Sequence, residues 1–110
     1  MRAASVHVQN RAAGILRENS GPNSGPVYVF AYLEGYKGPP VSLTMPVTTR
    51  EHGFEKFPPF FEGLLPEGPQ LESLLRREKI DRDDYFAQLV AIGGDLVGDV
   101  TVSMLEESDE

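Results

Sequence analysis

Apolar and polar residues alternate along much of the first half of the chain, a pattern typical of β-strands. Val6 and Val8 lie on one side of residues 5–9. Residues 13–17 follow after Asn10, a residue type that tolerates the backbone of a tight turn. The pattern therefore predicts a β-hairpin formed by these two segments.

Two further strands are expected in the first half. Residues 27–34 place apolar side chains on both faces, so this strand should be central or covered on both sides. Residues 41–47 alternate apolar side chains with serine and threonine. Because Pro46 cannot donate a ladder hydrogen bond, that strand should end there or lie at a sheet edge.

The second half changes to helical spacing. Residues 58–65 begin with two prolines, which suit a first helical turn, and continue with an apolar stripe of Phe60, Phe61, Leu64 and Leu65. A second helix should start at Pro69, and a third should be capped by Asp81, Asp83 or Asp84. Gly93 and Gly94 predict a left-handed stop to the third helix, followed by a last strand over residues 96–105.

This order of four strands, three helices and one strand indicates the α+β class. We expect a small antiparallel or mixed β-sheet with three short helices packed on one face. A chain of 110 residues should form a single domain. Its core should cover about residues 6–104, and residues 106–110 form an acidic C-terminal tail.

Charge is distributed unevenly. Residues 1–50 carry five Lys/Arg and two Asp/Glu, whereas residues 51–110 carry five Lys/Arg and fifteen Asp/Glu. An acidic surface repels nucleic acid and attracts a basic protein surface, although a solvated acidic face that aids solubility is an equal alternative. The chain has no cysteine, no signal sequence and no apolar run long enough to span a membrane, so a cytoplasmic location is expected.

No motif for catalysis, cofactor binding or metal binding is found. His7 and His52 lack the ligand spacing of a metal site, and the acidic residues at 81–84 lack the glycine and glutamate of a calcium loop. The glycines at 93–98 lack the lysine of a phosphate loop, and kinase signatures are absent. We therefore expect no cofactor, no metal and no enzymatic activity.

Two segments resemble the N-terminal subdomain of the HipA family of serine/threonine kinase toxins. They are Phe60-Phe-Glu-Gly-Leu-Leu-Pro66 and Ile92-Gly-Gly-Asp-Leu-Val-Gly98, which are similar to the family's Phe-Phe-x-x-Leu-Leu-Pro and Ile-Gly-x-Asp-x-Val-Gly at similar spacing. The resemblance covers roughly residues 6–104, and residues 41–47 are similar to the family's Leu-Ser-x-x-Leu-Pro.

The resemblance implies a role in a toxin–antitoxin system. In split, three-gene HipA-like systems, a small antitoxin of the HipS type supplies this subdomain and restrains a HipT-type kinase. We expect this chain to bind a HipT-like serine/threonine kinase by non-catalytic docking and to join a HipB-like helix-turn-helix protein in a ternary complex. The alternatives are the N-terminal subdomain of a full-length HipA kinase, or a co-repressor or assembly subunit of the complex. The start of the chain and its ending, Glu-Glu-Ser-Asp-Glu, favour a complete small protein.

The contact surface is expected between Gly53 and Pro69, where prolines and glycines bracket a short helix. Phe60, Leu64 and Leu65 should anchor this segment to the sheet. The residues then left to reach a protein partner form an aromatic anchor with acidic neighbours: Phe54, Phe57, Glu62 and Glu67.

Overall fold

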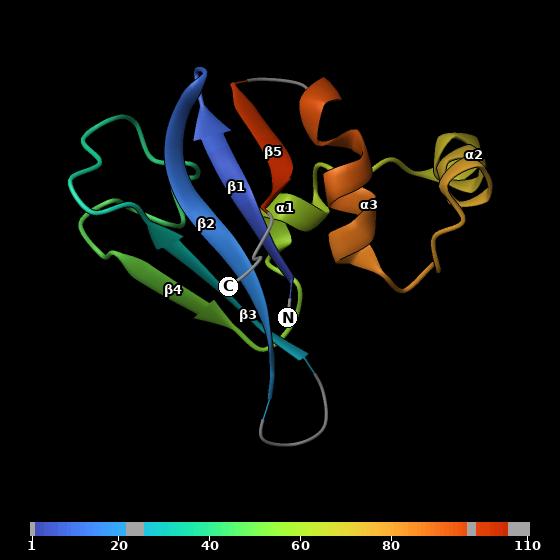
Figure 1. Ribbon diagram of the computed structural model, residues 1–110, viewed down its shortest axis with the longest axis horizontal. Helices are drawn as coiled ribbons and strands as arrows, with labels where there is room; N and C mark the ends of the chain where they lie inside the picture. Colours follow the sequence, from blue (N-terminus) through green and yellow to red (C-terminus); the bar gives the residue numbers. More distant parts are fainter. Residues whose placement is uncertain (1, 22–25, 97–98, 106–110) are drawn as a thin grey trace.

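The fold is a five-stranded antiparallel sheet with helices on one side, as expected from the sequence (Figure 1). The computed structural model describes residues 2–21, 26–96 and 99–105. The strand order is β4-β3-β2-β1-β5. The strands are β1 (Arg2–Val8), β2 (Arg11–Ser20), β3 (Pro26–Tyr32), β4 (Glu51–Phe54) and β5 (Val100–Leu105). The helices are α1 (Pro59–Glu62), α2 (Gly68–Glu78), α3 (Tyr85–Ile92) and the 3-10 helix η1 (Gly93–Asp95).

The predicted β-hairpin is confirmed as β1 and β2. The two strands are joined at Gln9 and Asn10, which both have positive φ, at 53° and 66°. Two consecutive residues of this kind match the right-handed twist of paired strands, and asparagine adopts this conformation more readily than most residues. The polar turn therefore fixes the register of the hairpin.

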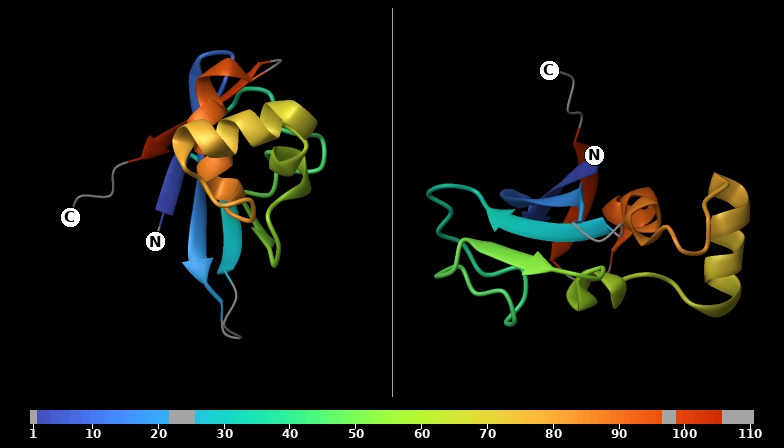
Figure 2. Two further views of the ribbon diagram at one scale, coloured as in Figure 1. Left: turned by 90° about the vertical axis from the view of Figure 1, so that its right-hand side faces the viewer. Right: turned by 90° about the horizontal axis from the view of Figure 1, so that it is seen from below.

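Strand β3 lies inside the sheet, between β2 and β4, and supplies the aromatic part of the core. One of its faces consists of Tyr28, Phe30 and Tyr32 and is buried under the helices and under the loop between β3 and β4. On the other face Val27, Val29 and Ala31 are half-buried, because no helix of the described chain covers that side (Figure 2). The central position is confirmed, and helical cover is found on one face.

The predicted strand over residues 41–47 is wrong. This segment is a loop with a single bridge between Ser42 and Met45. Its alternation instead buries Val41 and Met45, and the Tyr32 hydroxyl accepts from the Val41 amide at 2.9 Å and donates to the Met45 carbonyl. Two hydrogen bonds of the buried Tyr32 hydroxyl therefore hold this segment on the core in place of the expected strand pairing.

The edge of the sheet next to β3 is formed by β4, a strand that the sequence did not predict. Its four residues, Glu-His-Gly-Phe, have no run of apolar side chains that would indicate a strand. The paired strand β3 supplies its ladder instead, with Ala31 opposite Glu51 and Tyr28 opposite Phe54. Backbone pairing therefore decides the conformation of this segment.

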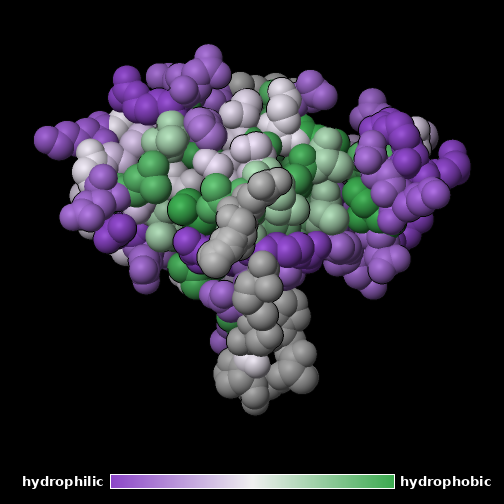
Figure 3. Space-filling view, in the orientation of Figure 1, coloured by the Kyte–Doolittle hydropathy of each residue, from purple (hydrophilic) through white to green (hydrophobic). Residues whose placement is uncertain are grey.

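The α-helices begin close to where the sequence predicted, with α2 starting at Gly68, one residue before Pro69, and α1 ending at Glu62, before the expected residue 65. Proline stands in the first turn of α1 and α2, and Asp84 caps α3 by accepting a hydrogen bond from the Ala87 amide at 3.2 Å. Helices α1 and α3 pack against the core, while α2 lies outside α3, away from the sheet (Figures 1 and 2). Figure 3 shows that hydrophilic side chains dominate the α2 side of the molecule. Among residues 2–21, 26–96 and 99–105, none of the helices combines the length and apolarity required to cross a membrane.

The expected left-handed stop after α3 is wrong. Gly93 has φ of −58° and continues into η1, and Gly94 is not among the glycines with positive φ. The reason for glycine is steric: a Cβ at Gly93 would lie 1.8 Å from the carbonyl oxygen of Val102 in β5. The end of α3 therefore rests directly on the backbone of an edge strand.

The start of α3 is attached to the sheet by Arg2. The Nε and Nη2 atoms of Arg2 donate to the two carboxylate oxygens of Glu18, each at 2.8 Å, and Nη1 donates to Asp84 Oδ2 at 3.1 Å. The guanidinium also lies 5.0 Å from the ring centroid of Phe86. Burial of the Asp84 carboxyl raises its pKa, but hydrogen bonds from Arg2 and the Ala87 amide lower it further, so that its pKa lies below the ordinary value.

Replacing Gly93 by alanine should lower the free energy of unfolding by about 1–3 kcal/mol or more, because the added Cβ overlaps a backbone carbonyl that cannot rotate away. The matched control is Gly94→Ala, since nothing lies within 4 Å of a Cβ built there. Urea denaturation of both variants tests this. Equal stability of the two variants would contradict the close approach of α3 to β5.

Replacing Asp84 by asparagine keeps the helix cap and removes the charge that faces Arg2. A carboxyl with a lowered pKa stabilises the fold above its unfolded pKa of about 4, and this stabilisation is lost as the pH falls through the folded pKa. The variant should therefore be less stable than the parent by about 1 kcal/mol at pH 7, and the difference should shrink below about pH 4. Thermal unfolding across this pH range, with Asp83→Asn as the exposed control, checks the prediction; a difference independent of pH would refute it.

Candidate functional site

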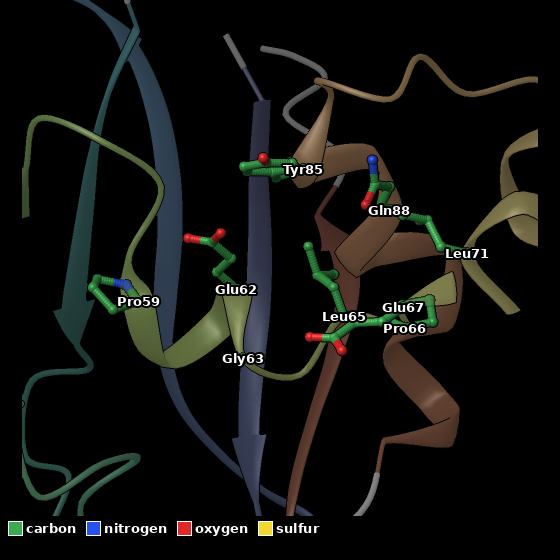
Figure 4. Close-up of a pocket in the computed structure, with 9 residues that line it drawn as sticks. All are labelled: Pro59, Glu62, Gly63, Leu65, Pro66, Glu67, Leu71, Tyr85 and Gln88. Atoms are coloured by element: carbon green, nitrogen blue, oxygen red, sulfur yellow. The ribbon is translucent and has the colours of Figure 1, made fainter. Parts of the chain in front are cut away.

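A groove separates α1 and the start of α2 from α3 (Figure 4). Its volume is about 370 Å³. The lining comes from three parts of the fold: the end of α1 with the turn after it, the first turns of α2, and one side of α3. These residues are Pro59, Glu62, Gly63, Leu65, Pro66, Glu67, Leu71, Tyr85 and Gln88.

The chain forms this groove because it turns twice within a few residues. Phe61 is fully buried and fixes α1 on the core. The Leu65 amide donates to the Glu62 carbonyl at 3.1 Å, which continues the turn after α1. Gly68 then adopts φ of +61°, a conformation that favours glycine, and directs α2 away from the sheet. The space left between this turn and α3 is the groove.

The carboxylates of Glu62 and Glu67, two of the four predicted contact residues, lie on the same groove. Both residues are exposed, and neither forms an ion pair with any residue that the structure describes. In Figure 4 the Glu67 side chain turns back toward Leu65, and the Glu62 carboxylate extends toward the space between Pro59 and Tyr85. The groove therefore combines apolar walls with negative charge at its rim.

The other two predicted contact residues do not lie on the groove. Phe57 was expected to be partly exposed, yet only 5% of its surface is accessible. Its ring makes edge contacts with Tyr28 at 5.3 Å and Tyr85 at 5.8 Å between centroids, so it belongs to the core. Phe54 is half-buried on β4 and packs against the core from the sheet edge.

The expected anchors of the segment do contact the core, but a neighbouring residue is buried more deeply. Phe60, Leu64 and Leu65 are only half-buried, although they pack against the core. Phe61, beside them, is the residue with no exposed surface, and its ring lies 6.0 Å from that of Phe30. Helix α1 has a single turn and buries the Phe61 side chain completely. The apolar stripe in the sequence did not show which of its four residues would be buried in this way.

Gln88 is a groove residue that the sequence analysis missed. It is 1% exposed and is the one polar side chain among the buried residues of the described chain. Its Nε2 donates to the backbone carbonyls of Asp81 at 3.3 Å and Arg82 at 2.9 Å, which holds the loop before α3. The available signal was a polar residue at an apolar helical position, three residues after Tyr85 and one before Leu89.

No metal site is formed by the residues described in the structure. Within residues 2–21, 26–96 and 99–105, no three histidine or acidic side chains gather where they could hold an ion. His7 is half-buried on β1, and the His52 ring nitrogen lies 3.1 Å from the Pro46 carbonyl oxygen. What the groove residues offer a partner is hydrogen-bond acceptors, negative charge and apolar surface.

A family model and a solved structure identify the same family. Residues 4–103 match the model of the HipA N-terminal domain. A solved structure described as the N-terminal domain of HipA toxin superposes with a TM-score of 0.74 at 25% identity, covering 98% of this chain and 96% of that one. A protein of Haemophilus influenzae is 28% identical over 93% of this chain and 92% of its own length. The "Putative kinase Y4dM" of Sinorhizobium fredii is 38% identical over 72% of this chain, which spans 21% of that longer protein.

Truncating Phe57 to alanine should destabilise the domain by about 3–5 kcal/mol, the usual cost of removing a buried phenylalanine side chain. Phe54→Ala is the matched control and should cost less, because Phe54 is half-buried at a sheet edge. Thermal unfolding measures both. An unchanged melting temperature for Phe57→Ala would show that its ring is at the surface, as the sequence first suggested.

Proposed function

The chain belongs to the family of HipA N-terminal domains, and we propose that it is the antitoxin of a split, three-gene toxin–antitoxin system. In this proposal it binds a HipT-type serine/threonine kinase and inhibits it by docking, without catalysis. The observation that carries the proposal is the match to the Haemophilus influenzae protein over 92% of that protein's length. It supports the view that this domain can exist as a small protein without an attached kinase.

Docking is supported by the character of the groove. A kinase that lacks this subdomain would keep the surface against which the subdomain packs in a full-length chain. The groove offers apolar walls and two exposed carboxylates, which suit a basic and partly apolar surface. The excess of acidic residues in the second half of the chain would also speed the approach of a basic partner.

Inhibition by docking requires no reactive group on this chain. Phosphoryl transfer depends on closure of the kinase around nucleotide and substrate. A bound domain stops the reaction either by occupying the cleft or by holding the two lobes apart. The proposal places both proteins in the cytoplasm, together with a HipB-like helix-turn-helix protein in a ternary complex.

A second candidate function is that of the N-terminal subdomain within a full-length HipA kinase. The Sinorhizobium fredii match favours it, because this chain there spans 21% of a protein described as a kinase. A kinase sequence directly continuous with this one would decide for that alternative, and a separate neighbouring kinase gene would decide for the antitoxin. A co-repressor role remains compatible with a ternary complex, in which the helix-turn-helix protein would make the DNA contacts.

Co-expression with the kinase encoded beside it tests the proposal. This protein should relieve the growth arrest that the kinase causes, because the bound kinase cannot close. The control is Gly93→Ala, whose steric overlap should reduce the folded fraction and with it the relief. Arrest that persists while both proteins are soluble and abundant would contradict the antitoxin role.

A further inference from the structure

The orientation of the Gln88 amide is fixed by its surroundings. Two backbone carbonyl oxygens, those of Asp81 and Arg82, lie within 3.3 Å of one end of the amide, which must therefore be the nitrogen. The Oε1 atom is consequently at the other end. Figure 4 shows this oxygen on the side of Leu65 and the nitrogen turned away from it.

Within the residues that the structure describes, the Gln88 Oε1 atom is an acceptor without a donor. No residue in the described part of the chain donates to it, although Gln88 is 1% exposed and lines the groove. Buried polar atoms are nearly always paired, and an unpaired one calls for an explanation. An acceptor directed into a groove is explained when a donor of a ligand enters that groove.

The rest of the groove defines the chemistry of that donor. Glu62 and Glu67 add two carboxylates that no described cation neutralises, so a positive charge is favoured. Leu65, Leu71 and Pro66 provide apolar walls, which suit an aliphatic stem. A volume of about 370 Å³ accommodates one long side chain with part of its backbone.

We propose that this groove binds an arginine side chain of the protein partner. The three-carbon stem packs against Leu65 and Leu71, and the guanidinium donates to Gln88 Oε1. The exposed side chains of Glu62 and Glu67 turn toward the guanidinium, so that their carboxylates accept hydrogen bonds from it. Arginine fits better than lysine because its planar head has five donors, enough for a carbonyl and two carboxylates at once. The inference rests on the proposed function, since it specifies the chemistry of the kinase surface that reaches this groove.

A short peptide tests the groove independently of any kinase. Acetyl-Ala-Arg-Ala-amide is titrated into the labelled protein and followed by NMR, with the citrulline peptide as control, because citrulline keeps the shape of arginine and lacks its charge. The arginine peptide should bind with a dissociation constant of about 1–10 mM and shift the resonances of Leu65, Leu71 and the Gln88 side-chain amide. Equal binding of the citrulline peptide, or shifts located elsewhere, would overturn the inference.

Charge-neutral variants test which carboxylates act. Glu62→Gln with Glu67→Gln should weaken arginine-peptide binding by at least about tenfold, as expected when charge-assisted hydrogen bonds are lost. The matched control is Glu34→Gln with Glu51→Gln, two exposed residues outside the groove that give the same change in net charge and should leave binding unchanged. If both pairs weaken binding equally, the attraction is diffuse and the groove has no arginine site.

The same variants measured against the kinase separate the two proposals. Failure of the unmodified protein to bind the kinase, while the arginine peptide still binds in the groove, contradicts the antitoxin role alone. Kinase binding that is unaffected by Glu62→Gln with Glu67→Gln contradicts the arginine site and leaves the antitoxin role standing. Weakened binding of both ligands supports both.

Discussion

The position of α3 against the sheet is the constraint on which the groove depends. At one end Gly93 rests on the Val102 carbonyl, so closely that no side chain fits between them. At the other end Arg2 joins Glu18 of β2 to Asp84, the cap of α3. With both ends of α3 attached to the sheet, Tyr85 and Gln88 are held opposite the turn after α1. The groove is therefore formed by a rigid helix on one side and a short, proline-bounded turn on the other.

Much of the fold could be predicted because the signals are local. The hairpin turn at Asn10, the prolines at the starts of α1 and α2, and the cap at Asp84 each depend on the backbone preference of one residue. It could not be predicted that residues 41–47 form a loop and that β4 forms the sheet edge instead. It depends on Tyr32, whose hydroxyl holds the loop, and on β3, which pairs with a strand of low apolar content. Likewise, the conformation at Gly93 followed from contact with β5 rather than from its place at a helix end.

The candidate site could be predicted in part for the same reason. Glu62 and Glu67 flank a turn that is evident in the sequence, and the structure places both on one groove. Phe57 was misplaced because burial depends on what covers a loop, here Tyr28 and Tyr85 from distant parts of the chain. Gln88 became informative only once its nitrogen was seen to be occupied by the loop before α3, which left its oxygen facing the groove. A family match of nearly full length identified the domain, whereas the contact chemistry required the arrangement of α1, α2 and α3.

The central claim is the proposal that this domain docks on a kinase through the groove between α1, α2 and α3. Hydrogen–deuterium exchange of the protein, with and without the HipT-type kinase that the proposal names as its partner, tests this most directly. Docking through the groove predicts slower exchange in the segment from Pro59 to Leu71 and at the start of α3, with the strands of the sheet unchanged. Slower exchange confined to the strands of the sheet, with the segment from Pro59 to Leu71 unchanged, would show that the kinase binds away from the groove and would contradict the account.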